Sequence, residues 1–145
     1  MSSTLTSKLT LSGTAADFGA ALNLSVSKAL TVQKPYVGIS REVVTTTGAN
    51  HIIVPNTDAR RYIYVKHTGV KSDGSASTDD LHIETYTNNN TGDQAIIVLK
   101  TGEFAFFPFD NALADPANSD DDNKVQLKAS ASTIVAEWAY FTVAS

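Results

Sequence analysis

The sequence predicts an all-β protein: a single-domain antiparallel β-sandwich or jelly-roll-like barrel with about nine or ten short strands. The 145 residues include 17 Thr and 14 Ser but only 4 Glu and 11 Lys+Arg. Such a hydroxyl-rich polar surface is typical of exposed strands, whereas surface helices usually carry Glu–Lys pairs. Apolar and polar residues alternate along many short segments, and the spacing of these segments leaves no room for the helical crossovers of a parallel sheet. The length suits one domain.

The N-terminal residues have the pattern of an arm. Within residues 1–12, Leu5, Leu9 and Leu11 alternate with serine and threonine, as in a half-buried strand or an extended segment. We therefore expect residues 1–12 to form an extended N-terminal arm and residues 13–145 to form a single β domain. Such an arm could add a strand to a neighbouring sheet.

The next segments alternate more regularly. The Ala-rich stretch 14–21 is compatible with a short helix, and the period of two over 22–32 predicts a strand. Two short β-branched-rich segments, 43–47 and 51–54, flank a Gly-Ala-Asn sequence, which predicts a hairpin.

The remaining strands are separated by turn-rich segments. They are predicted at 61–67, 81–87, 94–100, 103–109, 124–129 and 133–143. Of these, 81–87 and 94–100 are predicted to be hairpin partners, because only a polar Asn- and Gly-rich loop separates them.

The aromatic run at 104–109 has large apolar side chains on both faces. On a strand, Phe107 and Phe109 oppose Phe104 and Phe106. Either both sides are covered within the domain, or one side contacts another chain. We regard these four residues, together with the three leucines of the arm, as candidates for a subunit interface.

The motifs of the common catalytic classes do not occur. The chain has no G-x-S-x-G, H-E-x-x-H, Walker A or G-x-G-x-x-G sequence. His82 and Glu84 would share one face of a strand, so a metal site with His67 is conceivable, but a polar outer face explains the same pattern more simply. We expect no enzymatic activity and no cofactor.

The long acidic loop at 110–123 is a weak candidate for a metal site. Its Asn118, Asp120 and Asp122 place oxygen ligands at every second position, which suits Ca²⁺. An EF-hand would require Gly and Glu where this chain has Asn123 and Ala129, so an EF-hand is excluded. The alternative is a solvated loop kept extended by its like charges. Calorimetric titration with Ca²⁺ distinguishes the two.

Several aromatic residues suggest a carbohydrate-binding alternative. Tyr62, Tyr64, Tyr86, Trp138 and Tyr140 could form a stacking surface for sugar rings. The simpler interpretation is that most of them pack in the core or at a subunit contact, because aromatic residues favour strands.

Charge and composition narrow the partners and the location. The formal net charge is −4 and Lys and Arg never cluster beyond one Arg-Arg pair, so we expect no binding to nucleic acid. The apolar runs are too short to span a bilayer, and we expect neither a signal peptide nor a membrane partner. The chain has 0 Cys, which excludes disulfides and thiolate metal sites and suits assembly in a reducing cytoplasm.

Three segments of the chain resemble tailed-bacteriophage virion proteins. Residues 62–69 are similar to the strand ending in Lys/Asn-x-Gly of those proteins. Residues 97–103 followed by 104–108 resemble their succession of apolar strand, Gly-Glu and aromatic strand. Residues 125–129 followed by 135–143 resemble their closing hairpin. None of these segments is a chemical motif.

The resemblance implies a small virion structural protein. Capsid decoration (cement) is the first expectation, and a tail or fibre component is the second. Such proteins are commonly β-sandwiches or β-barrels that oligomerise on the particle. The implied partners are a major capsid protein or another virion protein and further copies of the chain, as a homo-oligomer such as a trimer. The implied location is the virion, after synthesis in the host cytoplasm.

Overall fold

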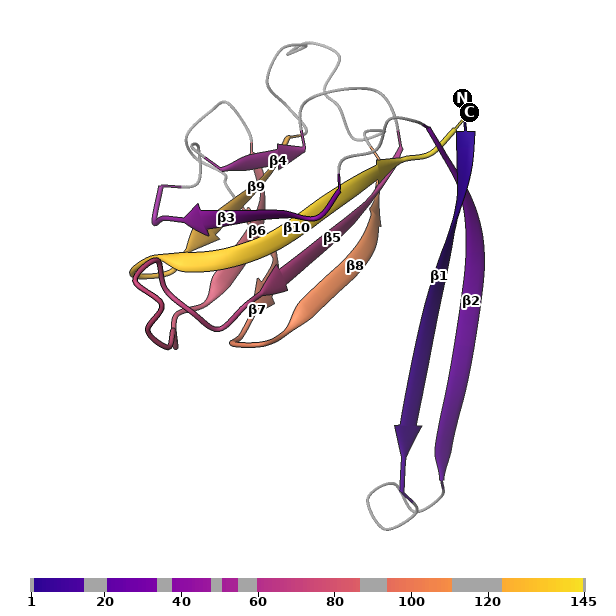
Figure 1. The fold of residues 1–145 in the computed structure, drawn as a ribbon, viewed down its shortest axis with the longest axis horizontal. Helices are drawn as coiled ribbons and strands as arrows, with labels where there is room; N and C mark the ends of the chain where they lie inside the picture. Colours follow the sequence, from indigo (N-terminus) through magenta and orange to yellow (C-terminus); the bar gives the residue numbers. More distant parts are fainter. Residues whose placement is uncertain are drawn as a thin grey trace. The chain divides into compact units, whose positions relative to one another are not determined.

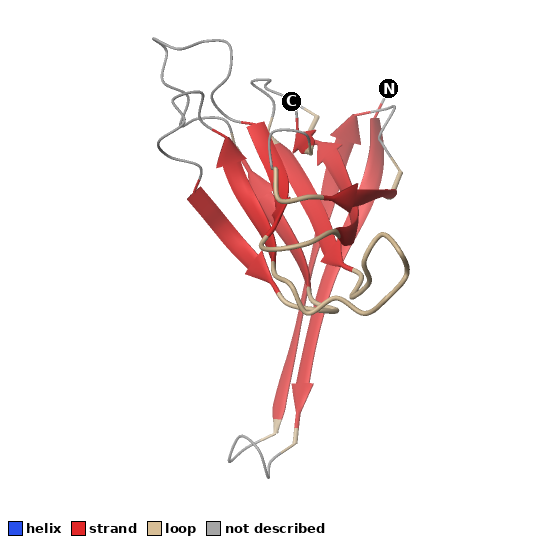
Figure 2. Ribbon diagram, turned by 90° about the vertical axis from the view of Figure 1, so that its left-hand side faces the viewer, coloured by secondary structure: helices blue, strands red, loops and turns tan. Residues whose placement is uncertain are grey.

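The computed structural model describes residues 2–14, 21–33, 38–47, 51–54, 60–86, 94–110 and 124–144. Figure 2 shows that these residues form strands joined by loops and turns, with no helix among them, so the predicted all-β class is confirmed. The short helix considered for 14–21 falls mostly outside the described residues. The strands are β1 (Ser2–Gly13), β2 (Leu22–Gln33), β3 (Ser40–Val44), β4 (Ile52–Val54), β5 (Arg61–His67), β6 (Leu81–Tyr86), β7 (Gln94–Leu99), β8 (Phe104–Phe109), β9 (Lys124–Ala129) and β10 (Ile134–Thr142).

The chain divides into two units. One contains Met1–Pro35 with Val143–Ser145, and the other contains Tyr36–Thr142. In the first unit, β1 and β2 pair antiparallel along their whole length, from Ser2 opposite Gln33 to Gly13 opposite Leu22. We call this pair of strands, visible in Figure 1 as a long two-stranded ribbon, the arm. The predicted arm, residues 1–12, is therefore one strand of a hairpin.

The second unit is a two-layered sandwich of eight strands in the described residues. Sheet I has the order β3-β10-β5-β8, and sheet II has the order β4-β9-β6-β7. The pairs β3–β10, β4–β9, β5–β8 and β6–β7 are nested along the chain and alternate between the two sheets. A long antiparallel hairpin folded over on itself in this way gives the strand order of a jelly roll.

The pairing partners agree with the prediction at one place and differ at two. The hairpin of β6 and β7 is confirmed, with Leu81 opposite Leu99. The hairpin predicted for 43–54 is wrong, because β3 pairs with β10 and β4 pairs with β9 in the other sheet. The closing hairpin is also wrong, since β9 and β10 lie in different sheets. In both cases a short connection crosses between the layers, and alternation reports which face is apolar but not which strand lies alongside.

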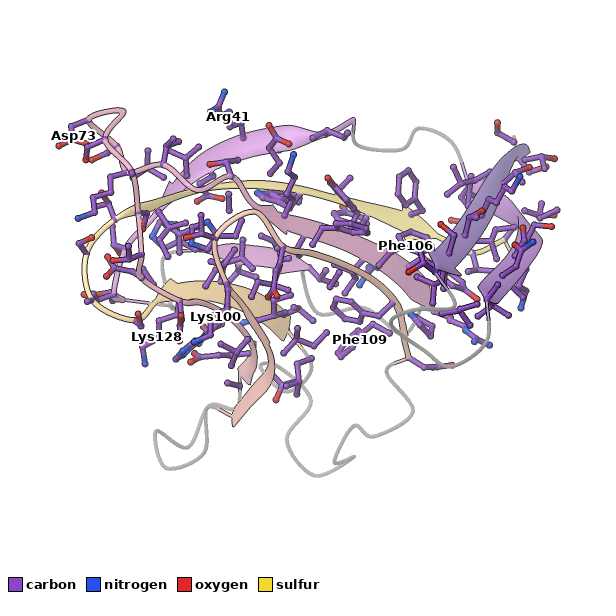
Figure 3. The ribbon with its side chains drawn as sticks, turned by 90° about the horizontal axis from the view of Figure 1, so that it is seen from below. Arg41, Asp73, Lys100, Phe106, Phe109 and Lys128 are labelled. Carbon is purple, nitrogen blue, oxygen red and sulfur yellow. The ribbon has the colours of Figure 1, made fainter. Side chains whose placement is uncertain are left out.

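The core lies between the two sheets, where the inward residues of each strand meet. In β5, Ile63 and Val65 are buried, whereas Tyr62 and Tyr64 on the opposite face are partly exposed, as the alternation predicts. The buried cluster comprises Val44, Ile53, Val54, Ile63, Val65, Leu81, Ile83, Leu99, Val125, Leu127, Ala129, Ile134 and Ala136. In Figure 3, Arg41 and Lys128 lie on opposite sides of the sandwich.

A buried histidine anchors the loop that joins β5 to β6. His67 is fully buried, and its Nε2–H donates to the carbonyl oxygen of Asp79 at 2.9 Å. Its Nδ1 accepts from the backbone N–H of Gly69, also at 2.9 Å. Asp73 lies near the far end of the same loop (Figure 3). Both ring nitrogens are thus used to hold the two ends of the loop, and this accounts for a buried histidine at the end of β5.

Gly69 and Gly74 in this loop form a matched pair of test positions. Their φ angles are +83° and +84°, so an alanine at either position incurs the strain of the left-handed region. A Cβ at Gly69 would also meet Thr101 Cγ2 at 3.0 Å, whereas nothing lies within 4 Å of one at Gly74. We expect Gly74→Ala to lower the free energy of unfolding by about 1–2 kcal/mol and Gly69→Ala to lower it further, in urea unfolding experiments. Equal losses would contradict the close approach of Thr101.

The carboxylate of Asp79 gives the loop a pH dependence. It accepts hydrogen bonds from the side-chain hydroxyl and the backbone N–H of Ser132, and these bonds lower the pKa of Asp79 below its ordinary value. Because the folded pKa lies below the unfolded pKa, the stabilisation is present above the unfolded pKa, about 3.9, and is lost as the pH falls through the folded pKa.

The variant Ser132→Ala tests this pH dependence. We expect it to be less stable than the unmodified chain at pH 6 and to approach it in stability as the pH falls below about 3, since the hydroxyl then loses its charged acceptor. Thermal unfolding midpoints at a series of pH values measure this difference. A stability difference that is the same at every pH would show that the ionised Asp79 carboxylate does not account for the stabilising effect of the Ser132 hydroxyl.

Candidate functional site

The arm has one apolar face and one hydroxyl-rich face. In its antiparallel register, Leu9 lies opposite Val26, Leu11 opposite Leu24, and Gly13 opposite Leu22. Side chains of such cross-strand pairs point to the same side of the ribbon. The other side carries Thr4, Thr6, Thr10, Ser12, Ser25, Ser27 and Thr31. Most of the Ser and Thr residues of the two strands therefore lie on one face, and the exceptions on the apolar face are Ser3 and Ser7.

The outer half of the apolar face is open to solvent. The exposed fractions are 48% for Leu9, 44% for Leu11, 39% for Leu22, 43% for Leu24 and 53% for Val26. We call these five side chains the distal patch. A two-stranded ribbon is marginal by itself in water, and contiguous exposed apolar surface commonly marks an interaction site. The distal patch is the clearest candidate functional surface among the described residues.

Lysine marks the boundary of the distal patch. Lys28 lies opposite Ser7 on the same face of the ribbon, and beyond them come the paired Leu5 and Leu30. Leu30 is only 4% exposed, and Leu5 is partly buried. Of the three leucines proposed from the sequence as interface candidates, Leu9 and Leu11 are therefore in the open patch and Leu5 is outside it.

A second apolar surface lies on the outer face of sheet I. In the register of β5 and β8, Lys66 lies opposite Phe104, Tyr64 opposite Phe106, and Tyr62 opposite Pro108. Phe104 is 63% exposed and Phe106 is 37% exposed. The rings of Tyr62 and Phe106 stack with centroids 5.5 Å apart. We call Tyr62, Tyr64, Phe104 and Phe106 the aromatic face.

Two polar groups at the aromatic face are the guanidinium of Arg60, beside it, and the hydroxyl of Tyr64, within it. The guanidinium of Arg60 lies 5.9 Å from the ring centroid of Tyr62, within the range of a cation–π contact. Burial raises the pKa of the Tyr64 hydroxyl, and the nearby carboxylate of Glu137 raises it further. Tyr64 therefore remains protonated at neutral pH and can donate a hydrogen bond from this surface.

The aromatic run of β8 divides between the two faces of its sheet. Phe107 and Phe109 pack against the core cluster, whereas Phe104 and Phe106 point outward. Figure 3 labels one member of each set, Phe106 and Phe109. Only the outward pair is therefore available as an interface candidate.

The aromatic residues considered for sugar stacking do not form one surface. Trp138 and Tyr140 pack against the core and stack on each other with centroids 6.5 Å apart. Tyr62 and Tyr64 lie on the outer face of the same sheet, and the side chain of Tyr86 is outside the described residues. The two phenylalanines that do lie beside Tyr62 and Tyr64 were missed, because only the pairing of β5 with β8 brings them together.

The histidines do not converge on a metal site. His67 is inside the sandwich on sheet I, whereas His82 lies on sheet II with its Nδ1 3.7 Å from Glu84 Oε1. No group of three or more His, Asp or Glu side chains in the described part of the chain could hold a metal ion. The three residues considered for a metal site, His67, His82 and Glu84, are therefore not brought together. The calcium candidates Asn118, Asp120 and Asp122 lie outside the described residues.

His51 and Glu42 form a hydrogen-bonded pair of the kind that also occurs in catalytic dyads. His51 Nδ1 donates to Glu42 Oε1 at 2.7 Å, and the indole N–H of Trp138 donates to Glu42 Oε2 at 3.1 Å. The other ring nitrogen of His51 accepts from the backbone N–H of Thr45 at 3.0 Å. Because that nitrogen is already occupied, His51 has no free lone pair to act as a general base. The network links β3 and β10 to the start of β4.

A second polar cluster lies on the outer side of sheet II. The carboxylate of Glu84, a residue only 4% exposed, accepts a hydrogen bond from Gln126 Nε2 at 2.9 Å. Lys128 Nζ lies 3.9 Å from Glu84 Oε1. His82 and Glu84 do share a strand face, as predicted. Their partners Gln126 and Lys128 come from β9, and these contacts partly compensate the charge of the buried carboxylate.

The comparisons with known proteins give no relative. No family model matches the chain, and no curated protein and no solved structure matches it. Within the described residues, no helix is long and apolar enough to cross a membrane.

Proposed function

We propose that this chain is a non-enzymatic structural protein of a virion, of the capsid decoration (cement) type, which binds a major capsid protein or another virion protein as an oligomer. The observation that carries the proposal is the arm, whose five distal apolar side chains are 39–53% exposed. A structural subunit acts through complementary surface area and protruding elements rather than through a reactive centre.

Two further features support this role. The nested strand order of the sandwich is the jelly-roll order found in viral capsid domains, although it also occurs in lectins, so the fold is compatible with several functions. In addition, His51 and His67 each use both ring nitrogens in structural hydrogen bonds. The resemblance of residues 62–69 and 97–108 to phage virion proteins points in the same direction.

Binding to viral particles tests the proposal. The purified chain would be mixed with head particles from the virus that encodes it, prepared without this chain, and sedimented. We expect binding that saturates at a fixed number of copies per head. Binding to purified tails but not to heads would support a tail or fibre component instead. A chain that remains in the supernatant with both particles would contradict the proposal.

The aromatic face favours one alternative, a carbohydrate- or receptor-binding module. Exposed aromatic rings stack on sugar rings, and Tyr64 offers a hydroxyl beside them. A glycan array tests this alternative with Phe104→Ala as the variant. Val98→Ala is the matched control, because Val98 is 44% exposed on the other sheet. Binding that Phe104→Ala abolishes and Val98→Ala preserves would support the module; no binding by the unmodified chain would exclude it for the glycans tested.

A further inference from the structure

Two apolar surfaces with matching dimensions are open on this chain. The distal patch is two strands wide and three cross-strand pairs long, from Leu9–Val26 to Gly13–Leu22. The aromatic face is also two strands wide and three pairs long, from Lys66–Phe104 to Tyr62–Pro108. Two sheets of equal width can pack face to face about 10 Å apart. The dimensions therefore allow one surface to cover the other.

We propose that the arm of one copy packs its distal patch against the aromatic face of a second copy, so that every copy in the oligomer both donates an arm and accepts one. This inference depends on one part of the proposed function, namely that the chain associates with further copies of itself. The leucine and valine side chains of the distal patch would cover Phe104 and Phe106, which are the most exposed phenylalanines described.

The area of the patches favours this exchange over a contact between two arms. Five residues of a strand pair cover roughly 17 Å by 10 Å, so two distal patches in contact bury much less than the about 1,000 Å² expected of a specific interface. In an exchange, each copy takes part in two contacts, one through its arm and one through its aromatic face. The buried area per copy is then about twice as large.

The charges also disfavour a contact between arms. Lys28 lies on the apolar face at the edge of the distal patch, and strands β1 and β2 carry no acidic residue, so two arms in contact through their apolar faces bring like charges together. Acidic residues outnumber basic ones in residues 36–145. Beside the aromatic face, Glu137 lies opposite Lys66 in the pairing of β10 with β5, where its carboxylate can approach a lysine of the arriving arm.

Cross-linking between two single-cysteine variants tests the exchange, since the native chain has no cysteine to interfere. Ser7→Cys places a thiol on the apolar face of the arm, opposite Lys28, and Lys66→Cys places one at the edge of the aromatic face. The two variants would be given different masses with a tag, mixed, and treated with a short bis-maleimide. We expect the mixed dimer to be the main product.

Ser27→Cys provides the matched control, because Ser27 lies on the hydroxyl-rich face of the same arm. We expect its yield of mixed dimer with Lys66→Cys to be at least tenfold lower. A main product that joins two Ser7→Cys chains would overturn the proposal in favour of arm-to-arm contact. Absence of the mixed dimer would also overturn it, and cross-linking of a separate Ser7→Cys/Lys66→Cys double variant only within its own chain would show that the chain is a monomer.

A second pair of substitutions tests the apolar contact without cysteines. Leu9→Thr with Val26→Thr keeps β-forming residues in the hairpin but removes the apolar side chains of one cross-strand pair. We expect self-association in sedimentation equilibrium to weaken at least tenfold while the far-ultraviolet circular dichroism spectrum is unchanged. Unchanged association would overturn the proposal. Because both tests use the purified chain alone, their outcome is independent of whether the chain binds viral heads.

Discussion

Deletion of residues 1–35 is expected to leave the eight-stranded sandwich folded and to reduce the chain to a monomer in solution. The deletion removes both strands of the arm together, and every strand of sheets I and II keeps its hydrogen-bonded neighbours. At the C-terminal end it removes the bridge of Val143 to Val32 and the hydrogen bond from Ala144 N to Thr31 O. The core cluster contains no residue of the arm.

Light scattering and urea unfolding measure these two effects. The molar mass should fall to that of one truncated chain, while a single cooperative unfolding transition remains. Loss of the cooperative transition would show that the arm contributes to the core of the sandwich. Retention of the oligomer would show that the arm does not carry the assembly.

A shorter deletion serves as the control for this experiment. Removal of residues 2–12 takes away β1 but leaves β2 with a long row of unpaired N–H and C=O groups beside its exposed leucines. Such an edge promotes association with other chains. We expect this variant to aggregate, and light scattering detects the aggregates. A well-behaved monomer would indicate that β2 does not depend on β1.

Replacement of His67 by leucine is expected to lower the free energy of unfolding by about 2–4 kcal/mol. Leucine fills the position with apolar atoms but leaves the N–H of Gly69 and the carbonyl of Asp79 without their partner. An unsatisfied buried polar group costs about 1–3 kcal/mol. Urea unfolding monitored through Trp138 measures the loss.

His82→Leu is the matched control, since it makes the same chemical change on the outer side of sheet II. The His82 side chain is 28% exposed, and its nearest charged partner is 3.7 Å away. We expect a loss below about 1 kcal/mol, because the His82 ring is partly solvated and its contact with Glu84 is longer than a hydrogen bond. Equal losses in the two variants would contradict the anchoring role of His67.

Much of the strand pattern could be predicted because alternation reports burial directly. Tyr62 and Tyr64 were separated correctly from Ile63 and Val65, and the strand ending at Phe109 begins within one residue of its predicted start. The hairpin predicted for 43–54 and the closing hairpin were wrong for the same reason. The residues of a strand show which of its faces is apolar, but they do not show which strand lies alongside.

The candidate surfaces depended on the register between strands. Leucine alternation in residues 1–12 predicts an amphipathic segment, but the distal patch forms only because Leu9 and Leu11 lie opposite Val26 and Leu24. Likewise, Phe104 and Phe106 join Tyr62 and Tyr64 only through the pairing of β5 with β8. No local pattern in the sequence gives these long-range neighbours.

The sequence by itself therefore determined that this is an all-β chain with a hydroxyl-rich surface and apolar faces at a period of two. It did so because side chains alternate along a strand regardless of the strand's neighbours. Only the tertiary structure decided that β1 pairs with β2, that β3 and β4 lie in different sheets, and that both ring nitrogens of His67 anchor a loop. These outcomes arise from packing between residues far apart in the chain.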